Sequence, residues 1–356
     1  MKLAMPVVWS DRHRLHEPGG EIFVGVRTRG TELPVRAERI REALDRAGAR
    51  LVEAQAQHED ALLRVHDPAL VAYLAGAWDQ WEAAGLTADP GQDRVVPYLF
   101  PHPGLILDGP PAIPTAITAR AGHFAYDTMT LIGPGTWDAA RAAVDVALTA
   151  ADLVLAGERT AYACCRPPGH HATRTCFGGS CYLNNSAAAA ARLRHALDRP
   201  VAVIDVDAHH GNGTQAIFYD DPDVLVGSVH VDPGAGWFPH FLGFAGETGT
   251  GAGDGANRNV PLPPGSGDEP WLEAVAGLAA WARERDAHAL VLALGVDAAD
   301  GDPEGALEVT PGGFRAAGRT LGALGLPTVV VQEGGYDLTT IGRLVCEALG
   351  GIEEGR

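Results

Sequence analysis

The strongest constraint on the fold of this 356-residue chain is its alternation of short apolar runs with segments of helical spacing. Five apolar runs have the length of a strand, and they lie at residues 160–165, 201–206, 224–230, 288–295 and 327–332. Three segments with helical spacing lie around them, at residues 137–157, 184–197 and 269–286. The alternation predicts an α/β protein whose mostly parallel sheet carries helices on both faces. Since no stretch of the sequence marks a linker or an internal repeat, we expect one domain over residues 1–356.

The formal net charge of −18 narrows the partners of the protein. An acidic surface repels nucleic acid and anionic membranes, and it attracts small cationic ligands. The longest apolar runs, such as residues 289–296, are far shorter than the roughly 20 residues of a membrane-spanning helix. The first residues run directly into charged ones, so we interpret them as a strand and not as a leader. Five cysteines, an odd number, favour reduced thiols and a cytoplasmic protein.

Three long segments rich in glycine and proline are too long to be simple connections, and they lie at residues 86–115, 167–183 and 232–267. Loops of this length in a compact domain are usually functional. In an open parallel sheet, ligands bind beyond the carboxyl ends of the strands. The polar clusters of this sequence follow directly after its predicted strands, so we expect them to meet at one edge of the sheet.

The clearest polar cluster ends the apolar stretch 201–213, VAVIDVDAHHGNG. Asp205, Asp207 and His209 alternate at period two, so an extended backbone places their side chains on one face. Asp297 follows another predicted strand in the same way. Two carboxylates and one imidazole suit a catalytic divalent metal, because they leave a position open for water or substrate. The alternative is that these residues only cap helices and satisfy turns.

A second cluster, RPPGHHA at residues 166–172, presents His170 and His171 side by side. Amide hydrolysis needs a base for the attacking water and an acid for the departing amine. Two histidines can divide this work if Asp205 holds one ring and Asn212 the other, because a carboxylate favours imidazolium and an amide does not. The alternative is a solvated turn.

A third cluster, VQEGGYD, places Tyr336 at the mouth of the sheet after the glycines 334 and 335. Its phenol would stabilise a developing oxyanion opposite the metal. The alternative is an ordinary turn with a packed ring.

Taken together, these segments and their neighbours resemble the histone deacetylase superfamily, and within it the bacterial acetylpolyamine amidohydrolases. The resemblance covers residues 9–336 and is densest after residue 167. It rests on RPPGHHA, FGGSCYLNN, IDVDAHHGNGTQAIFY, GSVHVDP, FPHFLGFAGETGTGAG, GVDAADGDP and EGGYD. It implies the arginase/deacetylase fold, with a sheet of about eight strands and long loops at their carboxyl ends.

The resemblance also implies an activity, the hydrolysis of an N-acetyl amide, and a cofactor. Asp207, His209 and Asp297 would bind one Zn²⁺ per subunit, with Fe²⁺ as the alternative metal. His171 would act as general base and then as acid, and His170 would be its electrostatic partner. Tyr336 would polarise the acetyl carbonyl.

The family further carries structural monovalent cations, which implies K⁺ at two places in this chain. One site would combine the side chains of Asp205 and Ser228 with the carbonyls of Asp207, His209 and Val229. The other would be formed by Phe218, Asp221 and Val224. His210 receives no role in binding, so we expect it to support the structure around the site.

For substrate binding, the resemblance implies that the Gly179 carbonyl accepts the substrate N–H and that Phe238 forms one wall of the tunnel. Ser180 stands where relatives often carry the opposite aromatic wall, so we expect a wider or more polar tunnel. Glu304 matches a glutamate that selects polyamines, and Glu17 lies in the first loop, where bacterial relatives also use acid. A carboxylate that lies some distance from the metal would hold the ammonium at the far end of the substrate.

These positions predict a deacetylase for small cationic acetylated amines such as N-acetylputrescine or N-acetylcadaverine. The segment 86–115 resembles an insertion that packs across a homodimer and narrows the entrance, which disfavours a protein-lysine deacetylase. A dimanganese ureohydrolase shares the fold, but Gly211, Ala298 and Ala299 offer no carboxylates for a second metal. A non-catalytic binding protein is disfavoured because every chemical position holds a competent residue.

Overall fold

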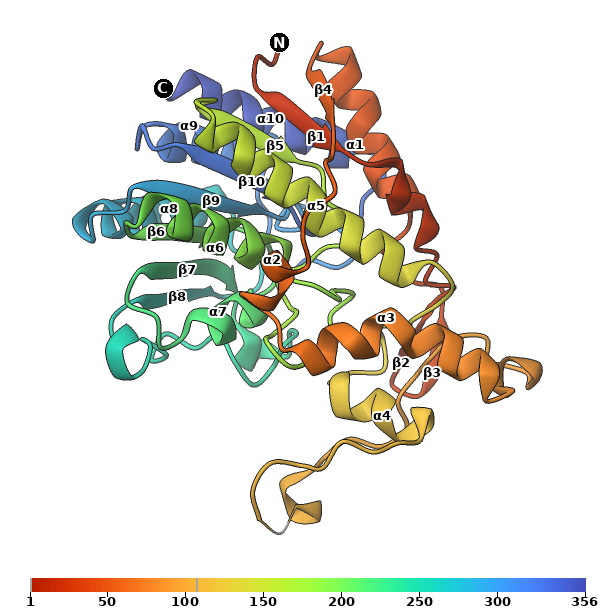
Figure 1. Ribbon diagram of the computed structural model, residues 1–356. Helices are drawn as coiled ribbons and strands as arrows, with labels where there is room; N and C mark the ends of the chain where they lie inside the picture. Colours follow the sequence, from red (N-terminus) through yellow and green to blue (C-terminus); the bar gives the residue numbers. More distant parts are fainter. Residues whose placement is uncertain (1, 107) are drawn as a thin grey trace.

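The computed structural model describes residues 2–106 and 108–356, and in that part of the chain eight parallel strands form one sheet (Figure 1). Their order across the sheet is β4 (Arg50–Glu53), β1 (Pro6–Trp9), β5 (Thr160–Ala163), β10 (Thr328–Gln332), β9 (Ala289–Leu294), β6 (Val201–Asp205), β7 (Val224–Val231) and β8 (Asn257–Leu262). The predicted α/β fold with a parallel sheet of about eight strands is therefore confirmed.

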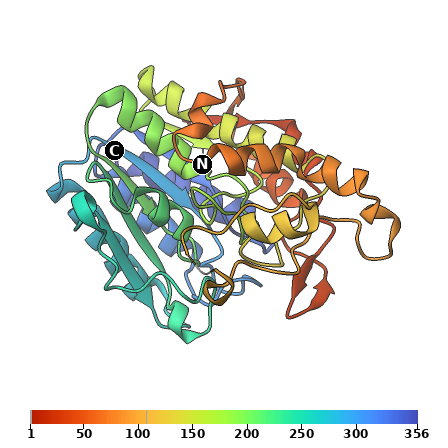
Figure 2. The same ribbon diagram turned by 60° about the horizontal axis from the view of Figure 1, so that its bottom comes forward.

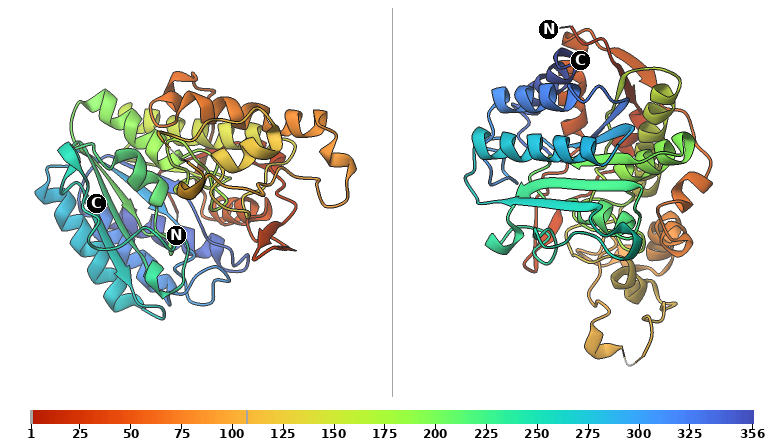
Figure 3. Two further views of the ribbon diagram at one scale, coloured as in Figure 1. Left: turned by 90° about the horizontal axis from the view of Figure 1, so that it is seen from below. Right: turned by 90° about the vertical axis from the view of Figure 1, so that its left-hand side faces the viewer.

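Helices cover both faces of the sheet, as the right-hand view of Figure 3 shows. One face packs against α5 (Thr136–Leu155), α6 (Asn185–Leu197) and α7 (Asn212–Phe218), and the apolar core on this side extends beyond the sheet to α2 (Asp60–Leu63), α3 (Pro68–Ala83) and α4 (Ile117–Phe124). The other packs against α1 (Val35–Arg46), α8 (Asp268–Glu284), α9 (Pro311–Gly322) and α10 (Ile341–Glu354). Within the described residues, no helix is long and apolar enough to cross a membrane.

The strand sequences explain why both faces are covered. In β6, Val201 and Val203 pack into the first apolar core, whereas Ala202 and Ile204 pack into the second. Successive side chains of a strand point to opposite faces, so a run that is apolar throughout needs a helical layer on each side.

The N-terminal end of helix α6 is hydrogen-bonded to the loop that follows β5. Asn184 is the N-cap of this helix, and its side-chain oxygen accepts a hydrogen bond from the Ala187 N–H at 2.8 Å. The amide nitrogen of the same side chain donates to the Ala172 carbonyl at 3.0 Å. The helix cap therefore also holds the loop that carries His170 and His171.

Strand β8 corrects the expectation of one uninterrupted loop over residues 232–267. This edge strand has buried polar residues, Asn257 and Asn259, at alternate positions, and it contains Pro261. Both asparagine side chains donate to the Gln215 side-chain oxygen, at 2.9 and 2.8 Å. The strand lacks the apolar pattern used for prediction because polar side-chain bonds hold its buried face.

Two segments extend away from the sheet. The hairpin of β2 (Glu21–Phe23) and β3 (Val26–Thr28) projects from the body of the molecule (Figure 2). The segment 86–115, of which residue 107 lies outside the described residues, projects beyond α3 and α4 (Figures 1 and 3).

Candidate active site

The predicted metal ligands meet at the carboxyl edge of the sheet. Asp207 and His209 follow β6, and Asp297 follows β9, its neighbour in the sheet. One ligand atom from each residue lies within 4.8 Å of the others. The His209 Nδ1 atom lies 3.3 Å from Asp207 Oδ1 and 3.2 Å from Asp297 Oδ2. Both aspartates are fully buried, so the three groups form a compact donor set.

This donor set fits a divalent cation. Burial and the neighbouring Asp207 raise the pKa of Asp297 to about 7, because two buried carboxylates that contact the same imidazole repel each other. A bound cation removes that repulsion, and two carboxylate oxygens with one imidazole nitrogen are ordinary zinc ligands. The backbone beside the site also fits, since Gly334 donates its N–H to Asp207 Oδ2 at 2.8 Å. A Cβ at Gly334 would lie 2.6 Å from that oxygen and closer still to Asp297, so only glycine permits this approach.

The two adjacent histidines have different partners. His170 Nδ1 lies 2.9 Å from Asp205 Oδ2, and His171 Nδ1 lies 2.7 Å from Asn212 Oδ1. Burial alone would lower the pKa of His170, but Asp207 and Asp205 raise it to about 10. Burial and the neighbouring His170 and His209 hold the pKa of His171 well below its usual value. His170 is therefore an imidazolium, and His171 is neutral.

The neutral state of His171 decides which of its nitrogens is basic. Asn212 Oδ1 can only accept a hydrogen bond, so His171 Nδ1 carries the proton and donates it. The Nε2 atom of His171 is then left as a proton acceptor. The ring lies 4.8 Å from the ring of Phe238, in an edge-to-face arrangement.

A buried carboxylate holds the backbone of the histidine loop at Gly169 and His170. Glu333 Oε2 accepts the N–H groups of Gly169 at 2.6 Å and His170 at 3.1 Å, and its other oxygen accepts the Ser186 hydroxyl at 2.7 Å. Burial raises the pKa of Glu333 to about 7. No pattern in the sequence predicted a role for Glu333, although it directly precedes the two glycines before Tyr336.

Tyr336 approaches the site from the loop after β10. Its N–H donates to Asp302 Oδ2 at 2.7 Å, and the Arg36 guanidinium lies 4.4 Å from its ring centroid. Burial raises the pKa of Tyr336 well above its usual value. The phenol therefore stays protonated and can donate a hydrogen bond to an oxyanion.

These groups surround a narrow cavity of about 80 Å³. It is lined by Glu21, Thr31, Met129, His171, Gly179, Ser180, His209, Phe238, Glu304 and Tyr336. Gly179 donates its N–H to Asp127 Oδ2 at 2.6 Å, and Ser180 donates its own to the Thr130 hydroxyl at 2.8 Å. The predicted tunnel residues Gly179, Ser180, Phe238 and Glu304 thus lie together.

The wall of this cavity is acidic. Glu304 accepts a hydrogen bond from the Thr31 hydroxyl at 2.8 Å. Burial and the nearby carboxylates of Glu304 and Asp127 raise the pKa of Glu21 to about 7. Among the described residues, no lysine or arginine lines the cavity. The charge that complements this pocket is therefore positive.

The first-loop acid that lines the cavity is Glu21, whereas the sequence predicted Glu17. The side chain of Glu17 is exposed, and its carbonyl accepts hydrogen bonds from Arg94. Gly19 and Gly20 have positive φ angles of 71° and 121°, and they reverse the chain between the two glutamates. The motif GGE could have indicated Glu21, because a glycine pair can reverse the chain and Glu21 begins the strand that follows.

The residues of the two predicted potassium sites lie at the two ends of β7. Ser228 pairs with Asp205 in the β6–β7 register, next to Val229, and its hydroxyl contacts His230 Nδ1 at 2.8 Å. At the other end of the strand, Phe218, Asp221 and Val224 line a common cavity of about 340 Å³.

His210 faces away from the predicted metal ligands and into a polar network. Its Nε2 atom lies 3.0 Å from Gln215 Oε1, and its ring packs 4.7 Å from the ring of His230. Burial and His230 hold the pKa of His210 well below its usual value, so the ring is neutral.

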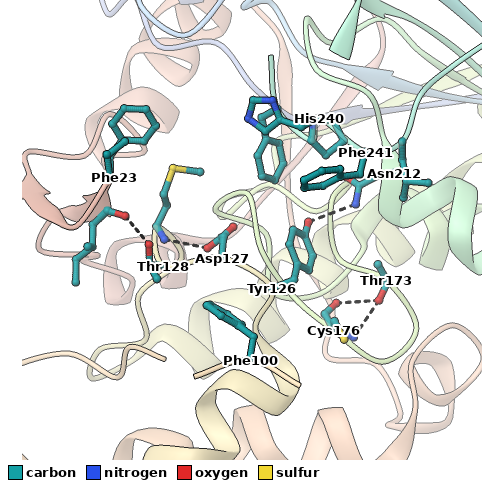
Figure 4. A pocket seen from close by; sticks show the side chains of 16 residues that line it. Phe23, Phe100, Tyr126, Asp127, Thr128, Thr173, Cys176, Asn212, His240 and Phe241 are labelled. Carbon is teal, nitrogen blue, oxygen red and sulfur yellow. Dashed lines mark hydrogen bonds between the residues drawn. The ribbon is translucent and has the colours of Figure 1, made fainter. Parts of the chain in front are cut away.

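A larger cavity of about 530 Å³ lies beside the narrow one and shares Met129 and Phe238 with it (Figure 4). On its wall, the Tyr126 hydroxyl donates to the His171 carbonyl at 2.9 Å and receives a bond from Asn212 at 3.5 Å. Tyr126 in the wall of this cavity therefore supports the Asn212–His171 pair, which sets the tautomer of His171.

Comparison with known proteins identifies the family. A family model described as histone deacetylase domain matches residues 31–352. The chain therefore belongs to the histone deacetylase family.

Among its relatives, an acetylpolyamine amidohydrolase of Mycoplana ramosa is 41% identical over 349 residues, which cover 98% of this chain and 99% of that protein. Acetylpolyamine amidohydrolase 1 of Pseudomonas aeruginosa is 40% identical and covers 97% and 98% of the two chains. The crystal structure of an acetylpolyamine aminohydrolase from Burkholderia pseudomallei superposes with a TM-score of 0.91 at 35% identity, over 99% of this chain and 100% of that one.

Proposed function

We propose that this protein is a zinc-dependent amidohydrolase that deacetylates small N-acetylated amines, with N-acetylputrescine and N-acetylcadaverine as the first candidates. The observation that carries the proposal is the narrow cavity, which combines His209, His171 and Tyr336 with two glutamates and, among its described lining, no basic side chain. The names of the near-full-length relatives support the same substrate class.

Asp207, His209 and Asp297 would hold one Zn²⁺, or Fe²⁺ in its place. A bound metal ion of this kind polarises the amide carbonyl and activates the attacking water. His171 takes a proton from that water at Nε2, the nitrogen left free by the bond to Asn212. The same atom then delivers the proton to the departing amine. His170, held as imidazolium by Asp205, stabilises the negative charge that develops nearby.

Two further groups would orient the amide. The protonated Tyr336 hydroxyl donates a hydrogen bond to the oxygen of the acetyl group as it gains charge. The Gly179 carbonyl accepts the N–H of the substrate, which aligns the scissile bond between Tyr336 and His171.

The acidic wall would select the amine. Glu21 and Glu304 form no ion pair with any described residue, so a cationic substrate would supply the missing countercharge. A protein-lysine deacetylase is the alternative within the same chemistry, and the comparison with an acetyl-lysine peptide separates the two.

The substrate proposal is tested by comparing kcat/KM for N-acetylputrescine, N-acetylcadaverine, acetylspermidines, an acetyl-lysine peptide and a neutral acetyl-amide. Glu304→Leu and Glu21→Leu should raise KM for the acetylated diamines at least tenfold more than for the neutral amide. Equal effects on both substrates would contradict an ammonium site.

In Tyr336→Phe, kcat should fall by about 10² or more with the metal content unchanged.

We also propose a homodimer and structural K⁺ ions at the two positions on β7. Support for the dimer comes from large apolar side chains that are exposed in the segment 86–115, namely Tyr98, Leu99, Leu105 and Ile113. The five cysteines have free thiols, which supports our placing the protein in the reducing cytoplasm.

A further inference from the structure

A cluster of buried charges lies behind the catalytic cavity and is not part of its lining. It contains Glu32, Arg36 and Arg166, whose exposed fractions are 4%, 3% and 2%. Glu32 Oε1 accepts a hydrogen bond from Arg36 at 2.8 Å and another from Arg166 at 2.9 Å. One carboxylate oxygen therefore holds two buried guanidinium groups.

Arg36 connects this carboxylate to the loop that carries Tyr336. Its Nε donates to the Gly335 carbonyl at 2.6 Å, and its Nη2 donates to the Glu333 carbonyl at 2.8 Å. The guanidinium plane also lies 4.4 Å from the centroid of the Tyr336 ring. Arg36 thus fixes the backbone immediately before Tyr336 and one face of its ring.

Arg166 connects the same carboxylate to a second part of the molecule. Its Nη1 donates to the carbonyls of His13 at 2.6 Å and His16 at 2.9 Å. It directly precedes the segment that leads to His170 and His171. Glu32 therefore joins the loop of the tyrosine to the loop of the histidines.

We propose that Glu32 is a positioning residue for Tyr336, because its carboxylate fixes Arg36 and Arg36 fixes both the backbone and the ring of the tyrosine. The inference rests on the proposed role of Tyr336 in amide hydrolysis. Without the Glu32 carboxylate, the two buried guanidinium groups would repel each other. Arg36 would then move away from the position in which it holds Tyr336. Although burial alone would raise it, the two arginines hold the pKa of Glu32 below its usual value, so the carboxylate is charged.

The test is a double-mutant cycle between Glu32→Gln and Tyr336→Phe in the zinc-loaded enzyme. In the wild-type background, Glu32→Gln should lower kcat by roughly tenfold or more, with KM within about twofold and the metal content unchanged. In the Tyr336→Phe background, the same substitution should lower kcat by less than about threefold, because the phenol that Glu32 positions is already absent. Glu42→Gln, further along α1 and paired with Arg39 at the surface, is the matched control and should leave kcat unchanged.

Equal losses of kcat in both backgrounds would overturn the proposal, because they would show that Glu32 only supports the fold. An unchanged kcat in the wild-type background would overturn it as well. Full activity of Tyr336→Phe alone would contradict the proposed function instead. If Glu32→Gln does not fold, Glu32→Asp is used in the same cycle, since it keeps the charge but is one methylene too short to reach both arginines. The same pattern, with smaller losses, is then expected.

Discussion

At the scale of single residues, the chemistry of the site depends on the groups that surround each of its two adjacent histidine rings. His170 and His171 are neighbours in the sequence and are both buried, yet one faces a carboxylate and the other an amide. Asp207 and Asp205 stabilise imidazolium at His170, whereas burial and the neighbouring His170 and His209 keep His171 neutral. Two identical side chains therefore receive different chemistry from their surroundings, and Asn212 sets the tautomer of the neutral one.

Replacing that amide by a carboxylate should convert the base into an acid. In Asn212→Asp, the new charge raises the pKa of His171, so the ring is protonated at neutral pH. We expect kcat/KM at pH 7 to fall at least tenfold and the acidic limb of the pH–rate profile to move to higher pH. Asn212→Ala is the control, since it should lower activity without that upward shift. A profile of unchanged position in Asn212→Asp would contradict the role of His171.

Glu333 makes stability depend on pH. Its pKa is about 7 in the folded protein, above the usual value of 4.5. Between these values the folded state keeps a proton that the unfolded state has lost, so the free energy of unfolding decreases as pH rises, by up to about 1.4 kcal/mol per unit. Glu333→Gln removes this dependence, and its amide can face the Ser186 hydroxyl.

The measurement is denaturant unfolding of the metal-loaded wild type and Glu333→Gln at pH 5, 6, 7 and 8. The stability of the variant relative to wild type should increase with pH across this range and level off above pH 7. A constant difference would show that Glu333 does not titrate there.

At the scale of elements, a polar network holds the loop that carries Phe238. Glu247 Oε2 accepts hydrogen bonds from the Gly243 N–H at 2.9 Å, the Gln215 amide at 2.6 Å and the Asn259 amide at 3.2 Å. His210 joins the network through Gln215. The edge strand β8 and the helix α7 therefore position one wall of the catalytic cavity.

Removing this carboxylate should loosen the wall. In Glu247→Ala the Gly243 N–H and the Gln215 amide lose this acceptor and the Asn259 amide loses one of its bonds, which should lower the free energy of unfolding by about 1–3 kcal/mol. We expect KM to rise several-fold, because Phe238 no longer holds the substrate, while kcat at saturation changes less. Glu284→Ala, an exposed residue near the end of α8, is the control for both measurements. A change in kcat with constant KM would contradict this account.

At the scale of the whole molecule, the proposed partners follow from two features, the acidic charge and the projecting segment 86–115. A net charge of −18 favours the approach of small cations at low ionic strength. The projecting segment exposes 74% of Tyr98 and 66% of Leu105, which is typical of a surface that another subunit covers.

Placing charges on that surface should separate the subunits. We expect Tyr98→Asp combined with Leu105→Asp to halve the native mass measured by light scattering, since an interface does not bury unpaired carboxylates. Leu15→Asp, at an exposed leucine outside the segment, should leave the mass unchanged. A wild-type protein that is already monomeric would contradict the proposed dimer.

Much of the site could be predicted because its ligands obey local rules. Asp207, His209 and Asp297 follow apolar strands, and parallel strands that lie side by side bring their carboxyl ends together. Strand β8 escaped prediction because its buried face is polar. Glu17 was chosen in place of Glu21 because the sequence does not show how far two glycines turn the chain.

The amino-acid sequence alone determines the fold class, the donor set for a metal and the two histidines with their partners, because strand periodicity and residue chemistry are local properties. Only the tertiary structure decides which acid lines the cavity and that Glu32 connects Tyr336 to the histidine loop. Glu32 bonds Arg36 and Arg166, and Arg36 reaches Gly335, almost 300 residues further along the chain. Such contacts have no pattern in the sequence, because they arise when distant loops pack into the same buried volume.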